Sequence, residues 1–215
     1  MAVSLPNGIT IALATAYGSA LTVTALTNAN PAVATSTAHG LSNGDYVVVT
    51  SGWAKLNNRV VRVSGVTANT FNLEGYDTSS TTDYPAGSGT GSVQKVTTWT
   101  QITQILDCQT SGGDMQFTSY SFLEQDFETQ LPTQASPQTI TLSIADDPSQ
   151  TGYTTLKTAA EARATRASKI TFPNSAIALY NGYVGFNETP SMTKNQVMAV
   201  QATLSLLSRP VRYAS

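Results

Sequence analysis

Four groups of side chains in this sequence have the chemical types that catalysis or metal binding requires. His39 is the only histidine and Cys108 is the only cysteine. Asp146 and Asp147 are adjacent carboxylates, and Asp45 follows an Asn-Gly pair. A metal site needs several ligands together, and a nucleophile needs a base beside it. The sequence around each of the four groups offers no such companion.

Each group has a simpler structural interpretation. His39 and Asp45 lie in turn-rich sequence, which predicts turn residues. The charge of Asp107 would raise the pKa of the neighbouring Cys108 thiol rather than activate it, so we predict a buried structural thiol. A proline follows Asp147, and this pair predicts the capped start of a helix. The chain has no phosphate loop, GxSxG or CxxC motif, so we expect no enzyme, no metal and no cofactor.

The composition narrows the class of protein. Hydrophobic residues make up 40% of the 215 residues, but charged residues make up only 11%, against about 25% in ordinary soluble proteins. A polar surface with few charges suits β-rich proteins that bury much of their surface in assemblies, and secreted β proteins share it. The net charge of −2 and the pI of about 5.3 argue against a dedicated nucleic-acid binder, which has a basic face.

The ends and hydropathy of the chain bear on its location. The N-terminal sequence has no basic region followed by a long apolar run, so we expect no secretory signal. No stretch approaches the roughly 18 apolar residues that a membrane helix requires, and we expect no membrane partner. A single cysteine excludes an intrachain disulfide. We therefore expect a chain that is made in a cytoplasm and stays soluble until it meets its partners.

Turn residues divide the chain into three segments. The first segment contains one strand-like run at 9–17. The second contains short strands separated by Asn-Gly, Ser-Gly, Asn-Asn and Glu-Gly pairs, a pattern typical of a small barrel or sandwich. The third contains longer strands, with strict alternation over 197–206. The strands expected in the second segment are 21–26, 32–37, 46–50, 59–64, 70–73 and 92–98.

The third segment also predicts one helix. It is expected to begin at Asp147, after an alternating strand at 139–144. Small residues on its apolar face suit close packing against a sheet. The residues expected on that face, at i, i+3, i+7 and i+11, are Tyr153, Leu156, Ala160 and Ala164.

Three motifs of the third segment carry a resemblance to a known family. They are K-I-x-F-P-N at 169–174, Y-x-G-Y-V at 180–184 and a closing strand that ends in S-R-P at 208–210. Together they resemble the C-terminal half of the tail tube (major tail) proteins of long-tailed, lambda-like bacteriophages. The stretch A-H-G-L-x-x-G-D-x-V at 38–47 is similar to a small β-barrel module found in many phage structural proteins.

The resemblance implies both a fold and a function. The fold would be mainly β: a tail-tube β-sandwich with one flanking α-helix, formed by 1–20 and 99–215, plus an inserted small β-barrel module at 21–98 that decorates the outside. The protein would be a structural virion protein that self-assembles into stacked hexameric rings. These rings would form a hollow noncontractile tail tube, the conduit for DNA ejection into the host.

The resemblance also implies partners and a location. The partners would be other copies of the chain and the tape measure, tail terminator and distal tail proteins, while double-stranded DNA passes through without specific binding. The protein would be found in the virion tail, and in the host cytoplasm during assembly. A monomeric secreted β-sandwich binding module, such as an adhesin or carbohydrate binder, is the alternative, and a hydrolase with paired carboxylates is a third class.

Charges are distributed unevenly along the chain. Residues 100–150 carry seven acids and no Lys or Arg, whereas residues 151–215 carry seven basic residues and two acids. One interpretation is that the two sets pair within one molecule. Alternatively, an acidic surface meets a basic surface on the next copy, in a heterologous contact that closes into rings or extends into filaments. An acidic wall also suits a DNA conduit, because each Lys or Arg contact to phosphate would hold the genome back.

The segment 117–132 contains both carboxylates, which are typical of a surface, and large apolar residues, which are typical of a core. A lone monomer would expose its aromatic side chains, and pairing with a neighbour would order them. Glu124, Asp126 and Glu128 stand at i, i+2 and i+4, which predicts one face of a strand. With Asp114, they are expected at the lumen or at a lumen-proximal interface. The residues expected at inter-subunit contacts are Phe122, Phe127, Leu131, Arg163 and Arg166.

Overall fold

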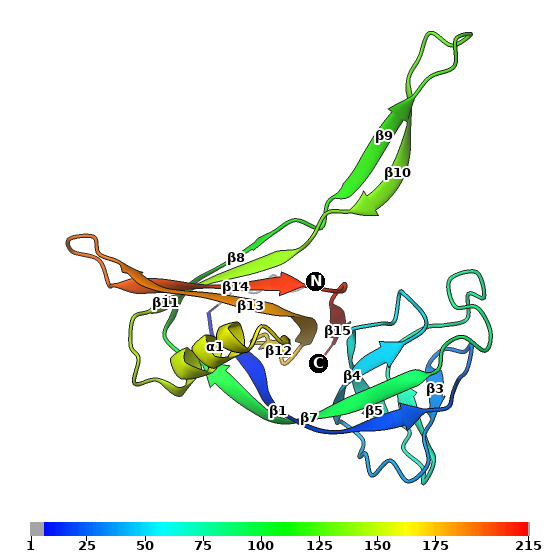
Figure 1. The fold of residues 1–215 in the computed structure, drawn as a ribbon, viewed down its shortest axis with the longest axis horizontal. Coiled ribbons are helices and arrows are strands. Elements are labelled where there is room, and N and C mark those ends of the chain that lie inside the picture. Colours follow the sequence, from blue (N-terminus) through cyan, green and yellow to red (C-terminus); the bar gives the residue numbers. More distant parts are fainter. Residues whose placement is uncertain (1–6, 215) are drawn as a thin grey trace.

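The computed structural model describes residues 7–214 as a mainly β protein with one α-helix (Figure 1), which confirms the predicted fold class. The first seven elements are β1 (Thr10–Val23), β2 (Ala25–Leu26), β3 (Ala32–Thr35), β4 (Tyr46–Ser51), β5 (Val60–Ser64), β6 (Thr70–Leu73) and β7 (Gly91–Ile102). The others are β8 (Ile105–Ser111), β9 (Met115–Tyr120), β10 (Thr129–Ala135), β11 (Thr139–Ala145), α1 (Thr151–Ala162), β12 (Thr165–Thr171), β13 (Ile177–Ser191), β14 (Ala199–Leu206) and β15 (Val211–Tyr213). Residues 1–6 and 215, at the outer ends of the predicted tube domain, lie outside the described residues.

Thirteen of the strands form one curled antiparallel sheet. Its order is β2-β3-β6-β5-β4-β7-β1-β12-β13-β14-β11-β8, with β15 paired to β13. Strands β9 and β10 form a separate two-stranded sheet. The sheet therefore ends at β8, whose outer edge has no partner strand among the described residues.

The first core cluster lies inside the curl formed by β1, β11, β12, β13 and β14. Alternation explains it, because successive side chains of a strand point to opposite faces of the sheet. In β11, Ile140, Leu142 and Ile144 are buried while the residues between them are only partly so. Helix α1 closes this cluster with Tyr153 and the fully buried Leu156.

A second core cluster lies among β3–β7. Trp53 and Phe71 are its largest buried side chains. The Trp53 indole nitrogen, Nε1, donates to the carbonyl oxygen of Pro85 at 2.8 Å, so the loop that follows β6 is fixed across this core. These short strands correspond to those predicted from the turn pairs.

The predicted boundaries at 20/21 and 98/99 fall inside two continuous strands. Strands β1 and β7 pair from Ile11↔Ile102 to Val23↔Gly91, with irregularities near Ala16. A third cluster, which includes Val60, joins the two parts of the sheet. The inserted module is thus packed against the rest of the chain, and the division into two domains stays a prediction.

The start of the helix differs from the prediction. Helix α1 begins at Thr151, and its N-cap, Gln150, makes no side-chain capping hydrogen bond. Asp147 instead closes a turn before the helix, because its carboxylate accepts hydrogen bonds from the Ser149 backbone NH at 3.1 Å and from the Ser149 hydroxyl at 2.6 Å. These bonds hold the pKa of Asp147 down at about 2. The prediction that Asp147 caps the helix is therefore wrong, because the helix begins about one turn after it.

The predicted apolar face of the helix is partly confirmed. Tyr153 and Leu156 are buried, and Ala160 packs against the core cluster. Ala164 is exposed because the helix ends at Ala162, and the next residue adopts a left-handed conformation. Within residues 7–214 no helix is long and apolar enough to cross a membrane.

Candidate subunit interface

A two-stranded arm projects from one end of the sheet (Figure 1). Strands β8 and β11 pair as part of the sheet, from Ile144↔Ile105 to Thr139↔Ser111. Beyond that point the same chain segments continue as β9 and β10, which pair only with each other. We call residues 114–136 the arm. It is the outer half of one long hairpin whose inner half belongs to the sheet.

Two glycines direct the arm away from the sheet. Gly112 and Gly113 have φ values of +79° and +88°, in the left-handed region that favours glycine. A Cβ on Gly112 would overlap the carbonyl oxygen of Pro137, so the two chain segments cross closely here. The base is then fixed by two hydrogen bonds: Gly113 NH donates to Ser136 Oγ at 2.9 Å, and Ser136 NH donates to the carbonyl oxygen of Asp114 at 2.9 Å.

The arm exposes apolar side chains on both of its faces. Every residue of β9, and every residue of β10 except Ala135, is exposed. Seven of the thirteen exposed large hydrophobic residues of the described chain lie on it: Met115, Phe117, Tyr120, Phe122, Leu123, Phe127 and Leu131. A two-stranded ribbon with no core is marginal in water, and an apolar surface of this kind marks an interaction site.

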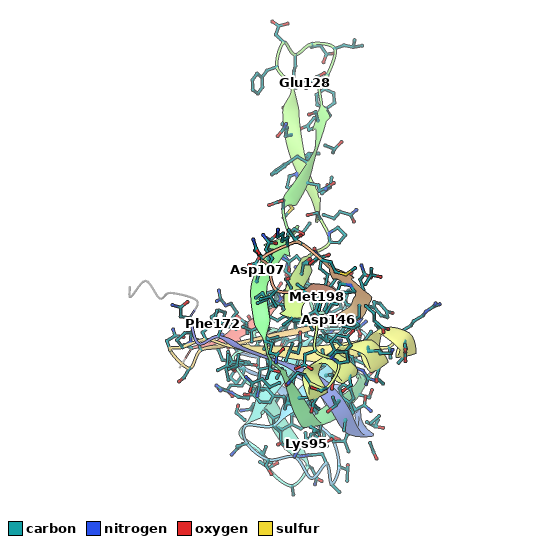
Figure 2. All side chains as sticks on the ribbon, turned by 90° about the vertical axis from the view of Figure 1, so that its left-hand side faces the viewer. Lys95, Asp107, Glu128, Asp146, Phe172 and Met198 are labelled. Carbon is teal, nitrogen blue, oxygen red and sulfur yellow. The ribbon has the colours of Figure 1, made fainter. Side chains whose placement is uncertain are left out.

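The three acids at the end of the arm lie in a loop and not in a strand. Glu124, Asp126 and Glu128 belong to the loop 121–128 that joins β9 to β10, so the argument that alternation places them on one strand face is wrong. The cause is that the hairpin turns where the sequence was read as continuing. All three are exposed, and Figure 2 shows Glu128 near the far end of the arm. Asp114 lies at its base.

The two arginines expected at contacts lie elsewhere, near the end of α1. Arg163 is the left-handed residue after the helix and lines a shallow hollow with Lys157, Phe186 and Glu188. Arg166 lies in β12, and its guanidinium carbon is 5.9 Å from the centre of the Tyr17 ring. These two arginines are therefore separate from the predicted site residues of the arm within one copy. Whether either group of residues meets another subunit stays a prediction.

The described ion pairs do not join the acidic and basic halves of the sequence. They are Lys55–Asp83, Arg62–Glu74, Lys95–Asp45 and Lys157–Glu188. Across residues 7–214, none of the seven acids of 100–150 pairs with a basic residue of 151–215. Within the described residues the seven acids of 100–150 therefore have no ion-pair partner, and in the basic half only Lys157 has one, Glu188.

The remaining candidates for chemistry have structural roles. His39 is buried, its Nδ1 accepts the Leu41 backbone NH at 3.0 Å, and its ring packs edge-on against Phe71. Asp45 accepts the Ser42 backbone NH at 2.8 Å, as a turn residue does, and also pairs with Lys95. Within residues 7–214, no group of three or more His, Cys, Asp or Glu side chains could hold a metal ion.

Cys108 is exposed and not buried as predicted. It lies on β8, the last strand of the sheet, which has a partner strand, β11, on one side only. Partial desolvation raises the pKa of its thiol, and the charge of Asp107 raises it further. The expected effect of Asp107 is therefore confirmed. At neutral pH Cys108 is in the protonated thiol form, which is less reactive than the thiolate.

The sequence comparison identifies the family of the chain. Residues 51–215 match the family model of the phage tail tube protein, TTP. The chain is a member of the phage tail tube protein family. Members of this family are structural components of the phage tail and not enzymes. The match to this tail tube protein begins inside the predicted module and includes β5–β15.

Comparison of the fold finds tube structures among its matches. The tail tube protein is similar to a chain of an extracellular contractile injection system, in a PVC sheath–tube complex in the extended state, with a TM-score of 0.36 and 16% identity over 50% of this chain and 80% of that one. It is also similar to a chain of the anti-feeding prophage cap, with a TM-score of 0.35 and 17% identity over 50% and 79%. Sequence comparison with curated proteins gives no match.

Sequence reasoning missed one exposed surface of the tail tube protein. Met192, Val197 and Met198 are all exposed where β13 turns into β14. The signal was present, because these apolar residues flank the polar run Thr-Lys-Asn-Gln. The alternation over 197–206 predicts a strand that includes Val197 and Met198, but β14 begins at Ala199.

Proposed function

We propose that this tail tube protein self-assembles into stacked hexameric rings that form the hollow tube of a noncontractile phage tail. In this tube the genome passes through the lumen during ejection. Copies of the chain are the main partner. The tape measure protein lies inside the tube, and the tail terminator and distal tail proteins bind its two ends. The module at 21–98 lies on the outside.

The arm is the observation that carries this proposal. It exposes seven large hydrophobic side chains on a ribbon that touches no core. Burial of apolar area gives about 25 cal/mol per Å², so covering both faces of such a ribbon is a substantial driving force for association. In a polymer the neighbouring subunits cover such a surface permanently, whereas a monomeric binding module leaves it in water until it meets its ligand.

The charge distribution is consistent with a conduit. Residues 100–150 contain seven acids and no Lys or Arg. Within the described chain none of these acids forms an ion pair with a basic residue of 151–215. A tube wall that contains such a segment repels phosphates and does not bind them. Each Lys or Arg contact to a phosphate would add about 0.9 to the slope of log affinity against log salt concentration, and a wall without such contacts does not hold the DNA in this way.

Removal of the arm tests the proposal. In the variant, residues 114–136 are deleted, so that Gly113 is followed directly by Pro137. The core clusters do not include the arm, so we expect unchanged thermal unfolding and a loss of rings and tubes in negative-stain micrographs at concentrations where the full chain forms them. A deletion variant that keeps its fold and still forms tubes would contradict the proposed role of the arm.

A further inference from the structure

The turn between β13 and β14 is a second exposed projection, which we call the methionine tip (residues 188–198). Figure 1 shows β13 and β14 extending together beyond the body of the sheet. Their pairing is irregular between Asn187 and Ser191. Met192 is 78% exposed, Val197 62% and Met198 50%. Neighbouring strands cannot cover these side chains, because β11 pairs with β14 only from Ala199 onward.

The methionine tip is the principal exposed apolar group outside the arm. Apart from the seven residues of the arm, six large hydrophobic residues are exposed among those described, and three of these six belong to the methionine tip. The others are single residues on different strands or loops. Methionine is flexible and its sulfur packs well against aromatic rings, so it suits surfaces that receive Phe and Tyr. The arm presents such rings.

The charges of the two projections are complementary. The arm carries four carboxylates and no basic residue. On the methionine tip, Glu188 is already paired with Lys157 at 2.8 Å. Lys194 is exposed and is in none of the ion pairs found between residues 7 and 214. Arg163 lines a hollow beside β13 whose other charged residues are Lys157, Glu161 and Glu188, so the positive and negative charges of that hollow balance. The unpaired positive charge of the methionine tip is therefore that of Lys194, which lies next to the exposed apolar residues of the tip.

The two projections of one copy cannot meet each other. They leave the body of the molecule in different directions (Figure 1), with the arm at the upper right and the methionine tip at the left. Each is anchored at its base by regular pairing, β11 with β8 for the arm and β13 with β14 for the tip. A contact between them must therefore join two copies. Because the two surfaces differ, the contact is heterologous and repeats from copy to copy.

We propose that the end of the arm of one copy docks on the methionine tip of a second copy. Phe122 and Phe127 pack against Met192 and Met198, and the carboxylates of the loop face Lys194. This inference rests on the proposed tube function and specifies its contact. It also places Glu124, Asp126 and Glu128 at an interface between subunits. The repulsion of phosphates by the tube wall then rests on the other four acids of 100–150, which are Asp107, Asp114, Asp146 and Asp147.

Disulfide trapping tests the contact directly. The parent for this test is Cys108→Ser, so that no native thiol remains. Leu123→Cys, at the end of the arm, is combined with Met192→Cys in one chain. The matched control combines Leu123→Cys with Thr81→Cys, an exposed position in the module. Under mild oxidation of assembled protein we expect the Leu123→Cys/Met192→Cys chain to form a ladder of covalent multimers, at least ten-fold above the control.

The outcomes of this test separate the contact from the function. Tubes that form with no ladder above the control would overturn the docking contact and leave the tube proposal standing. If neither the Cys108→Ser parent nor the unaltered chain forms rings or tubes, both the docking contact and the tube proposal would be overturned. A ladder that appears equally in dilute monomer would show collision without docking, and would also contradict the contact.

A charge reversal tests the electrostatic part independently. Lys194→Glu should slow assembly at low salt at least ten-fold, because it places an acid opposite the acidic loop. Adding Glu124→Lys and Glu128→Lys to the Lys194→Glu chain should restore the rate. Light scattering of each variant follows the assembly. Lys194→Glu that assembles at the parental rate, or a swap that gives no recovery, would contradict the pairing of the loop with the methionine tip.

Discussion

At the scale of single residues, Gly112 constrains the direction of the arm at its base. Its φ of +79° is unfavourable for any residue with a Cβ, and that Cβ would also overlap the carbonyl oxygen of Pro137. Gly87 is a matched control, because it has a φ of +78° and open space around it. The difference between alanine substitutions at the two sites therefore isolates the effect of the close crossing.

We expect Gly112→Ala to lower the free energy of unfolding by about 2–3 kcal/mol, against about 1 kcal/mol for Gly87→Ala. Gly112→Ala should also slow tube assembly, since the base of the arm must shift. Denaturant unfolding and light scattering measure the two effects. Equal losses of stability at both positions would show that the crossing at Pro137 does not constrain the chain.

Tyr213 connects the C-terminal strand to the module. Its hydroxyl oxygen accepts the Arg62 backbone NH at 2.7 Å, and the hydroxyl donates to the carbonyl oxygen of Glu74 at 3.2 Å. The side chain is 7% exposed. Burial raises its pKa to about 12, although the Arg62 hydrogen bond acts in the opposite direction.

This pKa predicts a loss of stability in alkali. An unfolded tyrosine ionises near pH 10, so the contribution of Tyr213 is complete below about pH 10 and is lost as the pH rises to about 12, for about 2 kcal/mol. Thermal unfolding between pH 9 and 12 should show a smaller slope for Tyr213→Phe than for the parent. Identical slopes for Tyr213→Phe and the parent would refute the link.

At this scale the sequence predicted some roles and missed others for physical reasons. Asp45 and His39 were read correctly as turn residues, because their neighbours in the chain determine a turn. Cys108 was not, because its exposure depends on β8 being the last strand of the sheet, which is a property of the topology. Asp147 lies one turn before the helix that it is predicted to cap, and its carboxylate accepts hydrogen bonds from Ser149 and not from the first NH groups of the helix.

At the scale of elements, alternation predicts strands well and predicts their ends poorly. The pattern of β11 follows from its sequence, because one face packs on a core. The arm has no buried face, so its sequence contains no such pattern, and the position of its turn was misjudged. The pairing of β1 with β7 is also hidden from local patterns, since it joins residues that are 91 positions apart at Ile11↔Ile102 and 68 apart at Val23↔Gly91.

The exposure of the arm predicts how it behaves before and after assembly. In the monomer its backbone hydrogen bonds join only two strands and are open to water, so amide exchange at 111–137 should be fast. In tubes the same amides should be strongly protected, while those of β11 and β14 change little. Hydrogen exchange followed by mass spectrometry measures both states. Equal protection of the arm in both would mean that it contacts no neighbour.

At the scale of the whole molecule, the question is whether the module at 21–98 is needed for the tube. It has its own core cluster, and the expected strands within it are present. It is nevertheless fastened to the rest by Tyr213 and by the Asn181 side-chain amide, which donates to the carbonyl oxygen of Asn58 at 3.1 Å. The sequence could suggest the module but not this fastening, because the fastening residues lie more than 100 positions away.

We expect the module to be dispensable for assembly and to contribute to stability. In the test, residues 24–90 are replaced by a short Gly/Ser turn, which preserves the Val23↔Gly91 end of the β1–β7 pair. The shortened chain should unfold at a lower temperature, because Leu179 and Tyr213 of the third core cluster lose their contact with the module and become exposed to solvent. It should still form rings and tubes. A folded product that never forms rings would make the module a part of the tube wall.

Electron microscopy of the unmodified chain at increasing concentration tests the central claim most directly. Negative-stain images, with size-exclusion chromatography of the same samples, report whether subunits associate and in what form. The account predicts rings with six-fold symmetry and hollow tubes built from their stacking, in increasing amounts as concentration rises. A chain that remains a folded monomer at every concentration, with no rings or tubes, would contradict it.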